Sequence, residues 1–200
     1  MSKILPFALA PLLVAGCLSS GPRPAVNWTV ESLPVAAAAA PKWGVVRVAQ
    51  VNVRAPYDGV RFAVLRPDGS IAFDAYNAFA ASPAAILRGT ACDIMAASGL
   101  FTRVLPSSSA AAADVSVEIT VERLAVDCRV KGARHAVVSL AVRLLKGREV
   151  VSSASGEGSL PAAAGGYTAA FSSAFNRALS EALKRLQDDG ASAPDRQKRR

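Results

Sequence analysis

Catalysis in this chain would have to use its single histidine, His135. Asp127 and Ser139 lie near it in the sequence, so a Ser-His-Asp arrangement is the one triad that the residue types allow. The pattern around His135 places it beside a turn on the polar face of a strand, where a histidine is ordinarily just exposed. Glu118 and Glu122 share a strand face, but paired carboxylates on an exposed sheet are usually only solvated. We therefore expect no catalytic site and no enzymatic activity.

Metal ions, cofactors and nucleic acids are not indicated either. Zinc sites need cysteine and histidine ligands at short spacings, whereas this chain has three cysteines, one histidine and no CxxC pair. The pair Gly165-Gly166 lacks the lysine that reaches a phosphate in phosphate-binding loops. The formal net charge is +8, but the basic residues are scattered or lie in the C-terminal tail, with few aromatic residues nearby. We expect no metal, no cofactor and no nucleic-acid partner.

Two of the three cysteines, Cys92 and Cys128, lie far from the N-terminus. In an oxidising compartment two such cysteines can form a disulfide. A helix packed on a sheet could bring them together, provided that their Cα atoms come within about 7 Å. Alternatively, both are small hydrophobic residues of the core. The sequence leaves both interpretations open.

The N-terminus has the layout of a secretory signal. Lys3 provides a small positive region, Ile4 to Gly16 is an apolar run, and Ala15 and Gly16 are the small residues that a signal peptidase accepts. The run is too short to span a bilayer as a helix, which needs ~20 apolar residues. Cys17 follows the small pair directly.

The stretch Leu13-Val14-Ala15-Gly16-Cys17 resembles the lipobox of bacterial lipoproteins. The resemblance implies a diacylglyceryl thioether on Cys17, cleavage before it and acylation of the new amino terminus. Several acyl chains, at about 0.8 kcal/mol per buried CH₂, would hold the chain firmly on a membrane. Residue 18 is Leu rather than Asp, which implies the cell envelope with the outer membrane favoured over the inner. The alternative is an ordinary signal peptide or a membrane anchor.

Changes in composition divide the chain into four parts. We expect a signal peptide at residues 1–16, and a lipidated N-terminus with a tether rich in Ser, Gly, Pro and Ala at residues 17–42. Within this tether, Trp28-Thr29-Val30 has strand-like composition and could pair with the sheet. The folded domain is expected at residues 43–188. Residues 189–200 form the expected disordered basic tail.

The clearest strand signals lie in the second half of the chain. Val115 to Val121 alternates apolar and polar residues, and the parity reverses from Leu124 onward, which predicts a bulge near Glu122-Arg123. After a turn, Ala136 to Leu144 provides the inward face of a long partner strand. Glu149 to Ser155 is predicted to be a third, antiparallel strand.

The first half of the domain is predicted to begin with a strand that carries a phase slip, Val45 to Val53. The turn signal Arg66-Pro67-Asp68-Gly69-Ser70 predicts a hairpin. Its first strand has Val60, Phe62 and Val64 on one face, and its second strand continues with Ile71, Phe73 and Ala75 at the same parity.

Two helices complete the prediction. Ser82-Pro83 is typical of an N-cap followed by proline at the first helical position, and Gly99 is placed to end that helix. A last helix follows Gly165-Gly166, with an apolar stripe that we expect to pack on the sheet. The predicted fold class is α/β (α+β): a single compact domain with a mixed, mostly antiparallel sheet and two main helices packed on one face.

The order of these segments resembles the ABC-type transport auxiliary lipoproteins, which are associated with MCE-type and paraquat-inducible lipid transport systems. The resemblance covers nearly the whole mature domain and depends on the ordered set rather than on one motif. Its residues are the lipobox, Asn27 to Val30, Asp58 to Phe62, Arg66 to Ser70, Phe73 to Tyr76, Ala78 to Val104, Ala113 to Val115 and the closing Ala-rich helix. One departure is Phe79, where many relatives are expected to have Trp.

This resemblance implies a non-catalytic, periplasm-facing adaptor in envelope lipid homeostasis. The partners it implies are an MCE-type periplasmic protein and an ABC permease with its ATPase. Tyr76 and Phe79 are the exposed apolar residues expected to dock a partner, and exposed strand edges make a homo-oligomer another expectation. The alternative is a structural or assembly lipoprotein of another envelope complex. A lipid-anchored hydrolase is the third class considered, against which the residue types argue.

Overall fold

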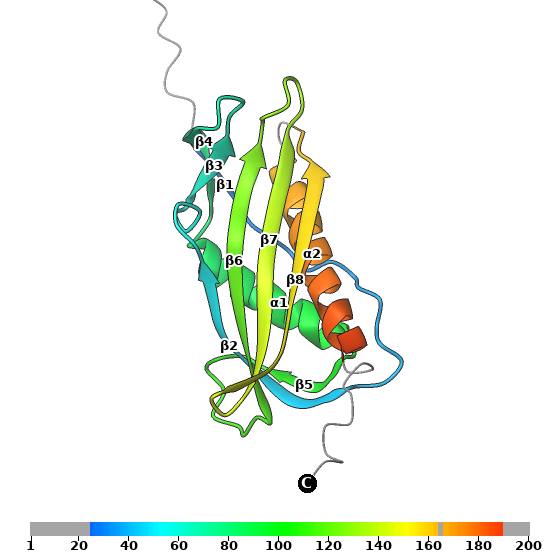
Figure 1. Cartoon of the computed structure of the whole chain (residues 1–200). Helices are drawn as coiled ribbons and strands as arrows, with labels where there is room; N and C mark the ends of the chain where they lie inside the picture. The colour runs from blue at the N-terminus through cyan, green and yellow to red at the C-terminus, as the bar shows by residue number, and fades with distance from the viewer. Residues whose placement is uncertain (1–24, 164–165, 190–200) are drawn as a thin grey trace, which may run out of the picture.

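One eight-stranded mixed sheet carries the two helices of the described residues on the same face (Figure 1). The structure, a computed structural model, describes residues 25–163 and 166–189. The predicted signal peptide, Cys17 and the predicted basic tail beyond Asp189 therefore lie outside the described residues. The elements are, in chain order, β1 (Val26–Trp28), β2 (Trp43–Val53), β3 (Arg61–Leu65), β4 (Ile71–Phe79), α1 (Pro83–Ala97), β5 (Phe101–Leu105), β6 (Val115–Asp127), β7 (His135–Lys146), β8 (Glu149–Pro161) and α2 (Tyr167–Asp189).

Strand β6 organises the sheet. On one side it pairs with β7, and β7 pairs with β8, both in antiparallel fashion. On its other side, β2 pairs in parallel with the first part of β6, and β3 pairs in parallel with the last part. Strand β5 extends the sheet beyond β2, while β4 and then β1 extend it beyond β3. The predicted α+β class is confirmed, with parallel pairings more numerous than expected.

The alternation in β6 and β7 sets the core. Val117, Ile119 and Val121 are fully buried beneath the helices, and after the register shift at Val121/Arg123 the inward residues are Leu124 and Val126. The predicted bulge is therefore confirmed. The phase slip of β2 is confirmed as well, because the register shifts between Val48 and Gln50.

The two helices begin and pack as their sequences predict. Proline occupies the start of α1, and Gly99 follows the helix with φ +64°, a conformation that favours glycine. The apolar stripe of α2 is buried against β7 and β8. Gly156 and Gly158 of β8 lie directly under the α2 backbone, where a Cβ would collide with the carbonyl groups of Ala178 and Ala174. These glycines thus allow α2 to lie unusually close to the edge strand.

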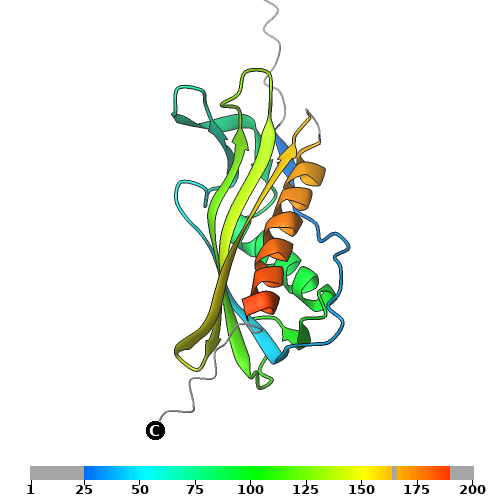
Figure 2. The ribbon, with the colours of Figure 1, turned by 45° about the vertical axis from the view of Figure 1, so that its right-hand side comes forward.

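Much of the predicted tether is part of the folded domain. Strand β1 pairs in parallel with the end of β4, as the composition of Trp28-Thr29-Val30 allowed. Residues 29–42, which we call the strap, then run across the outer side of the helices (Figure 2). The expected boundary at residue 43 was therefore wrong: β1 and the strap already belong to the domain, because side chains from both helices hold the strap's backbone.

Three buried side chains hold the backbone of the first part of the strap. Thr90 Oγ1 donates to the Val30 carbonyl at 2.8 Å, and the Glu31 N–H donates to Ser172 Oγ at 2.8 Å. Asn176 accepts from the Leu33 N–H at 2.9 Å and donates to the Glu31 carbonyl at 3.0 Å. Thus the polar residues that interrupt the buried faces of α1 and α2 satisfy the backbone of the strap, as buried polar groups require.

The predicted β3–β4 hairpin forms, but its faces differ from the prediction. Phe62 faces the helices and is fully buried. Ile71 and Phe73 instead pair with Leu65 and Ala63, on the opposite face of the sheet. Leu65 and Ala63 belong there to a second, small apolar cluster. A hairpin turn fixes which residues are paired, and the observed register places these side chains away from the main core.

Candidate docking surface

An irregular stretch of β4 presents Tyr76 to solvent. Between the pairs Ala63↔Phe73 and Arg61↔Ala78, β4 contains several residues more than β3, so residues 74–77 bulge out of the ladder. Tyr76, which lies in this bulge, is 50% exposed. Bulges commonly re-aim a side chain in this way. The predicted docking role of Tyr76 is thus compatible with its position.

Hydrogen bonds hold the bulge in one conformation. The Asp74 carboxylate accepts from the Tyr76 N–H at 2.8 Å and from the Asn77 N–H at 3.0 Å. Trp28 Nε1 donates to Asn77 Oδ1 at 2.8 Å, which ties β1 to the bulge. Burial acts to raise the pKa of Asp74, but these hydrogen bonds outweigh it and the pKa is lowered. The ionised carboxylate therefore stabilises the conformation that exposes Tyr76.

Further apolar side chains extend this surface along the hairpin. Phe73 is 45% exposed, and Ile71 and Val26 are exposed to a similar degree. β1 pairs only with residues 77–79 of β4, so within the described ranges residues 71–76 have no strand partner on that side. A bare strand edge flanked by apolar side chains is a template for binding an extended segment. We refer to the exposed apolar side chains of this strand, Ile71, Phe73 and Tyr76, as the β4 surface.

Phe79 is not part of the β4 surface, which corrects the prediction for this residue. Its ring is 4% exposed and packs against Phe62 and Phe171, with centroids 4.6 and 5.3 Å away. Phe79 has the same sequence parity as Phe73, but the bulge between them turns the strand over. Phe79 therefore faces the core and cannot offer a ring to a partner without leaving it.

The residues of the conceivable triad are not assembled. Asp127 and His135 are directly paired across β6 and β7, whereas Ser139 pairs with Arg123. Four residues of extended strand place Ser139 roughly 13 Å from His135. Within the described ranges no side-chain hydrogen bond joins His135 to either residue, and Asp127 is instead ion-paired with Arg129 at 2.6 Å. The expectation of no enzymatic activity remains a proposal.

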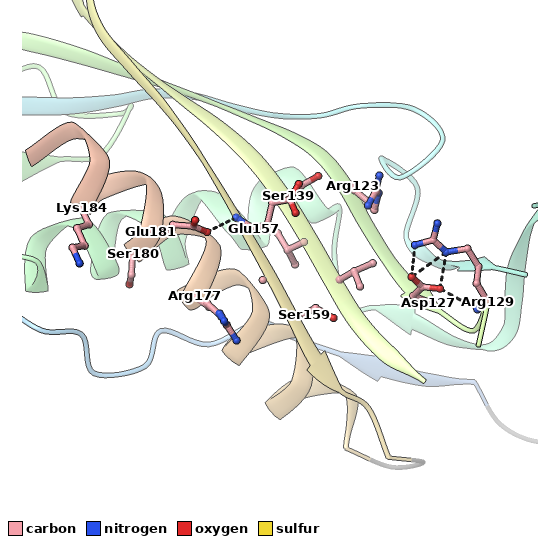
Figure 3. A pocket seen from close by; sticks show the side chains of 13 residues that line it. Arg123, Asp127, Arg129, Ser139, Glu157, Ser159, Arg177, Ser180, Glu181 and Lys184 are labelled. Carbon is pink, nitrogen blue, oxygen red and sulfur yellow. Dashed lines mark hydrogen bonds and ion pairs between the residues drawn. The ribbon is translucent and has the colours of Figure 1, made fainter. Parts of the chain in front are cut away.

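A broad cavity of about 810 Å³ extends along the edge of β8, between the outer face of the sheet and α2 (Figure 3). Two of its three acidic side chains are engaged: Arg129 holds Asp127, and Glu181 accepts from the Glu157 N–H at 2.9 Å. These hydrogen bonds lower the pKa of both Asp127 and Glu181. The Glu157 carboxylate forms no salt bridge among the described residues. Cations also line the cavity, and three of them form no salt bridge among the described residues: Arg123, Arg177 and Lys184.

The two remaining cysteines are both free thiols. Cys92 lines a surface cavity together with Val104, and Val104 pairs with Val46 of β2. Val46 in turn pairs with the first residue of β6, whereas Cys128 follows the last residue of that strand. Strand β6 has 13 residues, so roughly 40 Å of extended chain separates its two ends. The disulfide alternative is therefore wrong for this fold. Burial raises the pKa of the Cys92 thiol, which keeps it protonated.

Two features, a membrane-spanning helix and a cluster of metal ligands, are absent from the described residues. Neither helix in those ranges is long and apolar enough to cross a membrane. In the same part of the chain, no three His, Cys, Asp or Glu side chains gather as a metal site would require. The lipidation predicted for Cys17 concerns a residue outside the described ranges and stays a prediction.

Sequence reasoning missed the strap, although Thr90, Ser172 and Asn176 carried a signal. Each is a polar residue within the apolar face of a helix. Such residues are costly in a core unless they bind a buried partner. The missing information was the partner, because the strap lies more than a hundred residues away from Ser172 and Asn176 in the sequence.

Comparisons with known proteins identify the fold. No family model matches the chain, and no curated protein is similar to it in sequence. A crystallised protein of the DUF330 family from Xanthomonas campestris is similar, with 22% identity, coverage of 84% of this chain and 98% of that one, and a TM-score of 0.59. This similarity shows the fold alone.

Two weaker structural similarities are to proteins whose descriptions are more specific. PelC from Paraburkholderia phytofirmans, crystallised as a dodecamer, has 17% identity over 74% of this chain and 92% of its own, with a TM-score of 0.42. Lipoprotein GNA1162 from Neisseria meningitidis has 11% identity over 76% of this chain and 100% of its own, with a TM-score of 0.36. Structural agreement at this level supports no inference about function.

Proposed function

We propose that this chain is a non-catalytic, lipid-anchored adaptor of the cell envelope that faces the periplasm from the outer membrane. In this proposal the β4 surface docks an MCE-type periplasmic protein of a lipid transport system that also contains an ABC permease and its ATPase. The protein supplies position rather than chemistry. The main supporting observation is Tyr76, an exposed aromatic residue on a fixed bulge beside an unpaired strand edge.

Three further observations favour an adaptor. The Leu13 to Cys17 stretch resembles a lipobox, which would place the domain at a membrane surface. The ordered set of segments resembles the auxiliary lipoproteins of lipid transport systems. Finally, the residues that could form a triad do not meet in the described structure. Aromatic residues of this kind are enriched among the side chains that contribute most to binding.

Site-specific photo-crosslinking in intact cells tests the docking surface. A photoreactive amino acid in place of Tyr76 should give a covalent adduct with an MCE-type protein, identified by mass spectrometry. The matched control places the same photoreactive residue at Val130, which is also highly exposed but lies in the β6–β7 turn. The control should not give that adduct.

Other adducts at residue 76 would decide between the remaining possibilities. An adduct with a different envelope protein, without any transport component, would replace the proposal with the structural or assembly role. An adduct with a second copy of the chain would assign the β4 surface to self-association. Equal labelling from residues 76 and 130 would show that the β4 surface has no special role.

A further inference from the structure

A second cavity, of about 360 Å³, lies between the strap, α2 and the segment that follows α1. Val35 and the alanine run at residues 36–39 form its outer wall. Leu100 and Leu183 form its inner wall. Ser180 and Lys184 lie at its border and also line the cavity along the edge of β8. The apolar cavity thus adjoins the cationic one at two shared side chains.

Hydrogen bonds hold the strap on either side of residues 34–37, which cover part of this cavity. Asn176 holds Leu33, the Ala38 N–H donates to the Ser98 carbonyl at 2.7 Å, and Lys42 Nζ donates to the Leu186 carbonyl at 2.6 Å. Within the described structure, no hydrogen bond to the rest of the protein fixes residues 34–37. This part of the wall can therefore move outward without breaking a hydrogen bond.

Three polar or charged side chains of α2 project to the same side of the helix. Arg177, Ser180 and Lys184 project from α2 toward the side where the strap lies, whereas Glu181 points toward β8 (Figure 3). Glu181 is already bound by the Glu157 N–H and by Arg185 at 2.6 Å. The positive charge of Lys184 therefore remains available at the border of the apolar cavity, and that of Arg177 in the adjoining cavity along the edge of β8. This arrangement suits an anionic group attached to a hydrocarbon.

We propose that the cavity beneath the strap binds the acyl chain of a single-chain anionic amphiphile, with Lys184 and Arg177 contacting its phosphate or carboxylate. The alanine side chains leave room for a methylene chain, and Leu100 and Leu183 provide its apolar contacts. Burial of methylene groups supplies binding energy, while the cations select for negative charge. This inference concerns α2 and the strap, and it does not depend on docking at the β4 surface.

Photolabelling of membranes that contain the full chain tests the inference. The probe is a lysophosphatidic acid with a diazirine at the end of its acyl chain, and the matched probe is a neutral monoacylglycerol with the same chain. Peptide mapping should place adducts of the anionic probe at residues 35–39 and near Leu183. The neutral probe should label these positions about tenfold less, which corresponds to about 1.4 kcal/mol.

Three variants distinguish the contact with the anionic headgroup, the contact with the apolar cavity and the non-specific effect of charge at the membrane. Lys184→Glu should lower labelling by the anionic probe to the level of the neutral one, and Ser180→Phe should lower labelling by both by filling the junction. Lys146→Glu, an equal charge change at an exposed site on β7, should have no effect. Thermal melts of the purified variants confirm that each is folded.

Several results would overturn the inference. Labelling that is the same for both probes, or unchanged by Lys184→Glu and Ser180→Phe, would mean that the probe reports only its presence in the membrane. Adducts confined to the β4 surface would place the lipid contact elsewhere. If excess inorganic phosphate abolished labelling and no adduct formed at residues 35–39, the cations would bind only the anionic group, and the cavity would not hold an acyl chain.

Discussion

Phe79 and Tyr76 lie close together on one strand but have opposite environments. Phe79 is enclosed by aromatic rings from β3 and α2, while Tyr76 stands in solvent. Truncating a buried aromatic residue removes its contacts and leaves a cavity, whereas truncating an exposed one removes little folding energy. Substitutions at these two residues therefore distinguish a loss of stability from a loss of docking.

Phe79→Ala should lower the free energy of unfolding by about 3–5 kcal/mol. Tyr76→Ala should change it by no more than about 0.5 kcal/mol. Chemical denaturation of both variants measures these values directly. A large loss of stability in Tyr76→Ala would show that its ring is packed rather than available for a partner, and the β4 surface would lose its central residue.

Asp74 gives the bulge a dependence on pH. Its folded-state pKa is lowered, so the carboxylate stabilises the fold fully above its ordinary pKa of 3.8. That contribution is lost as the pH falls through the lower folded-state pKa. Carboxyl ¹³C shifts in an acid titration should give a midpoint below 3.8, and the Tyr76 and Asn77 amide signals should move with it. Asp74→Asn should abolish this movement, and a midpoint above 3.8 would contradict the account.

At the scale of elements, strands and helices with a clear local pattern were predictable from the sequence, whereas the bulge in β4 was not. The alternation from Val115 to Val121 and the Ser82-Pro83 start signal predicted a strand and a helix, because each depends on neighbouring residues. The inward direction of Phe79 could not be followed, because the bulge at residues 74–77 depends on hydrogen bonds from Asp74. Tyr76 is thus the only residue of the β4 surface whose exposure was predicted from the sequence.

The strap was not predictable for a different physical reason. Its alanine-rich composition is typical of a linker, and nothing within it specifies a partner. Its position comes from side chains on two distant helices that replace a strand partner. Composition can therefore predict that such a segment is irregular, but only tertiary structure shows that it is bound.

Asn176→Ala should release the strap while leaving the sheet intact. The change leaves the Leu33 N–H and the Glu31 carbonyl without their partner, and we expect a loss of about 1–3 kcal/mol in the free energy of unfolding. Hydrogen exchange should accelerate at Glu31 and Leu33 more than in β6. The control is Asn52→Ala, because Asn52 is exposed on β2 and its side chain accepts a hydrogen bond from the nearby Gln50. Unchanged exchange at Glu31 and Leu33 would show that the strap is held by other contacts.

At the scale of the whole molecule, the proposal assigns the position of the domain to a lipid on Cys17. If Cys17 carries the lipid, Cys17→Ser should accumulate as an uncleaved or soluble precursor, because no thioether can form and the apolar run is too short to span a bilayer. Membrane fractionation and intact-mass analysis of the N-terminus measure this. A variant that is still acylated and membrane-bound would reject the lipid anchor.

The central claim is that the protein works by docking and not by catalysis, and one measurement tests it most directly. Cells lacking the protein are complemented with the wild type, Tyr76→Ala or His135→Ala, and their survival in detergent is compared at equal levels of folded protein. The account predicts that His135→Ala restores survival fully, because no proton transfer is assigned to His135, whereas Tyr76→Ala does not. Failure of a normally folded His135→Ala, together with full rescue by Tyr76→Ala, would contradict it.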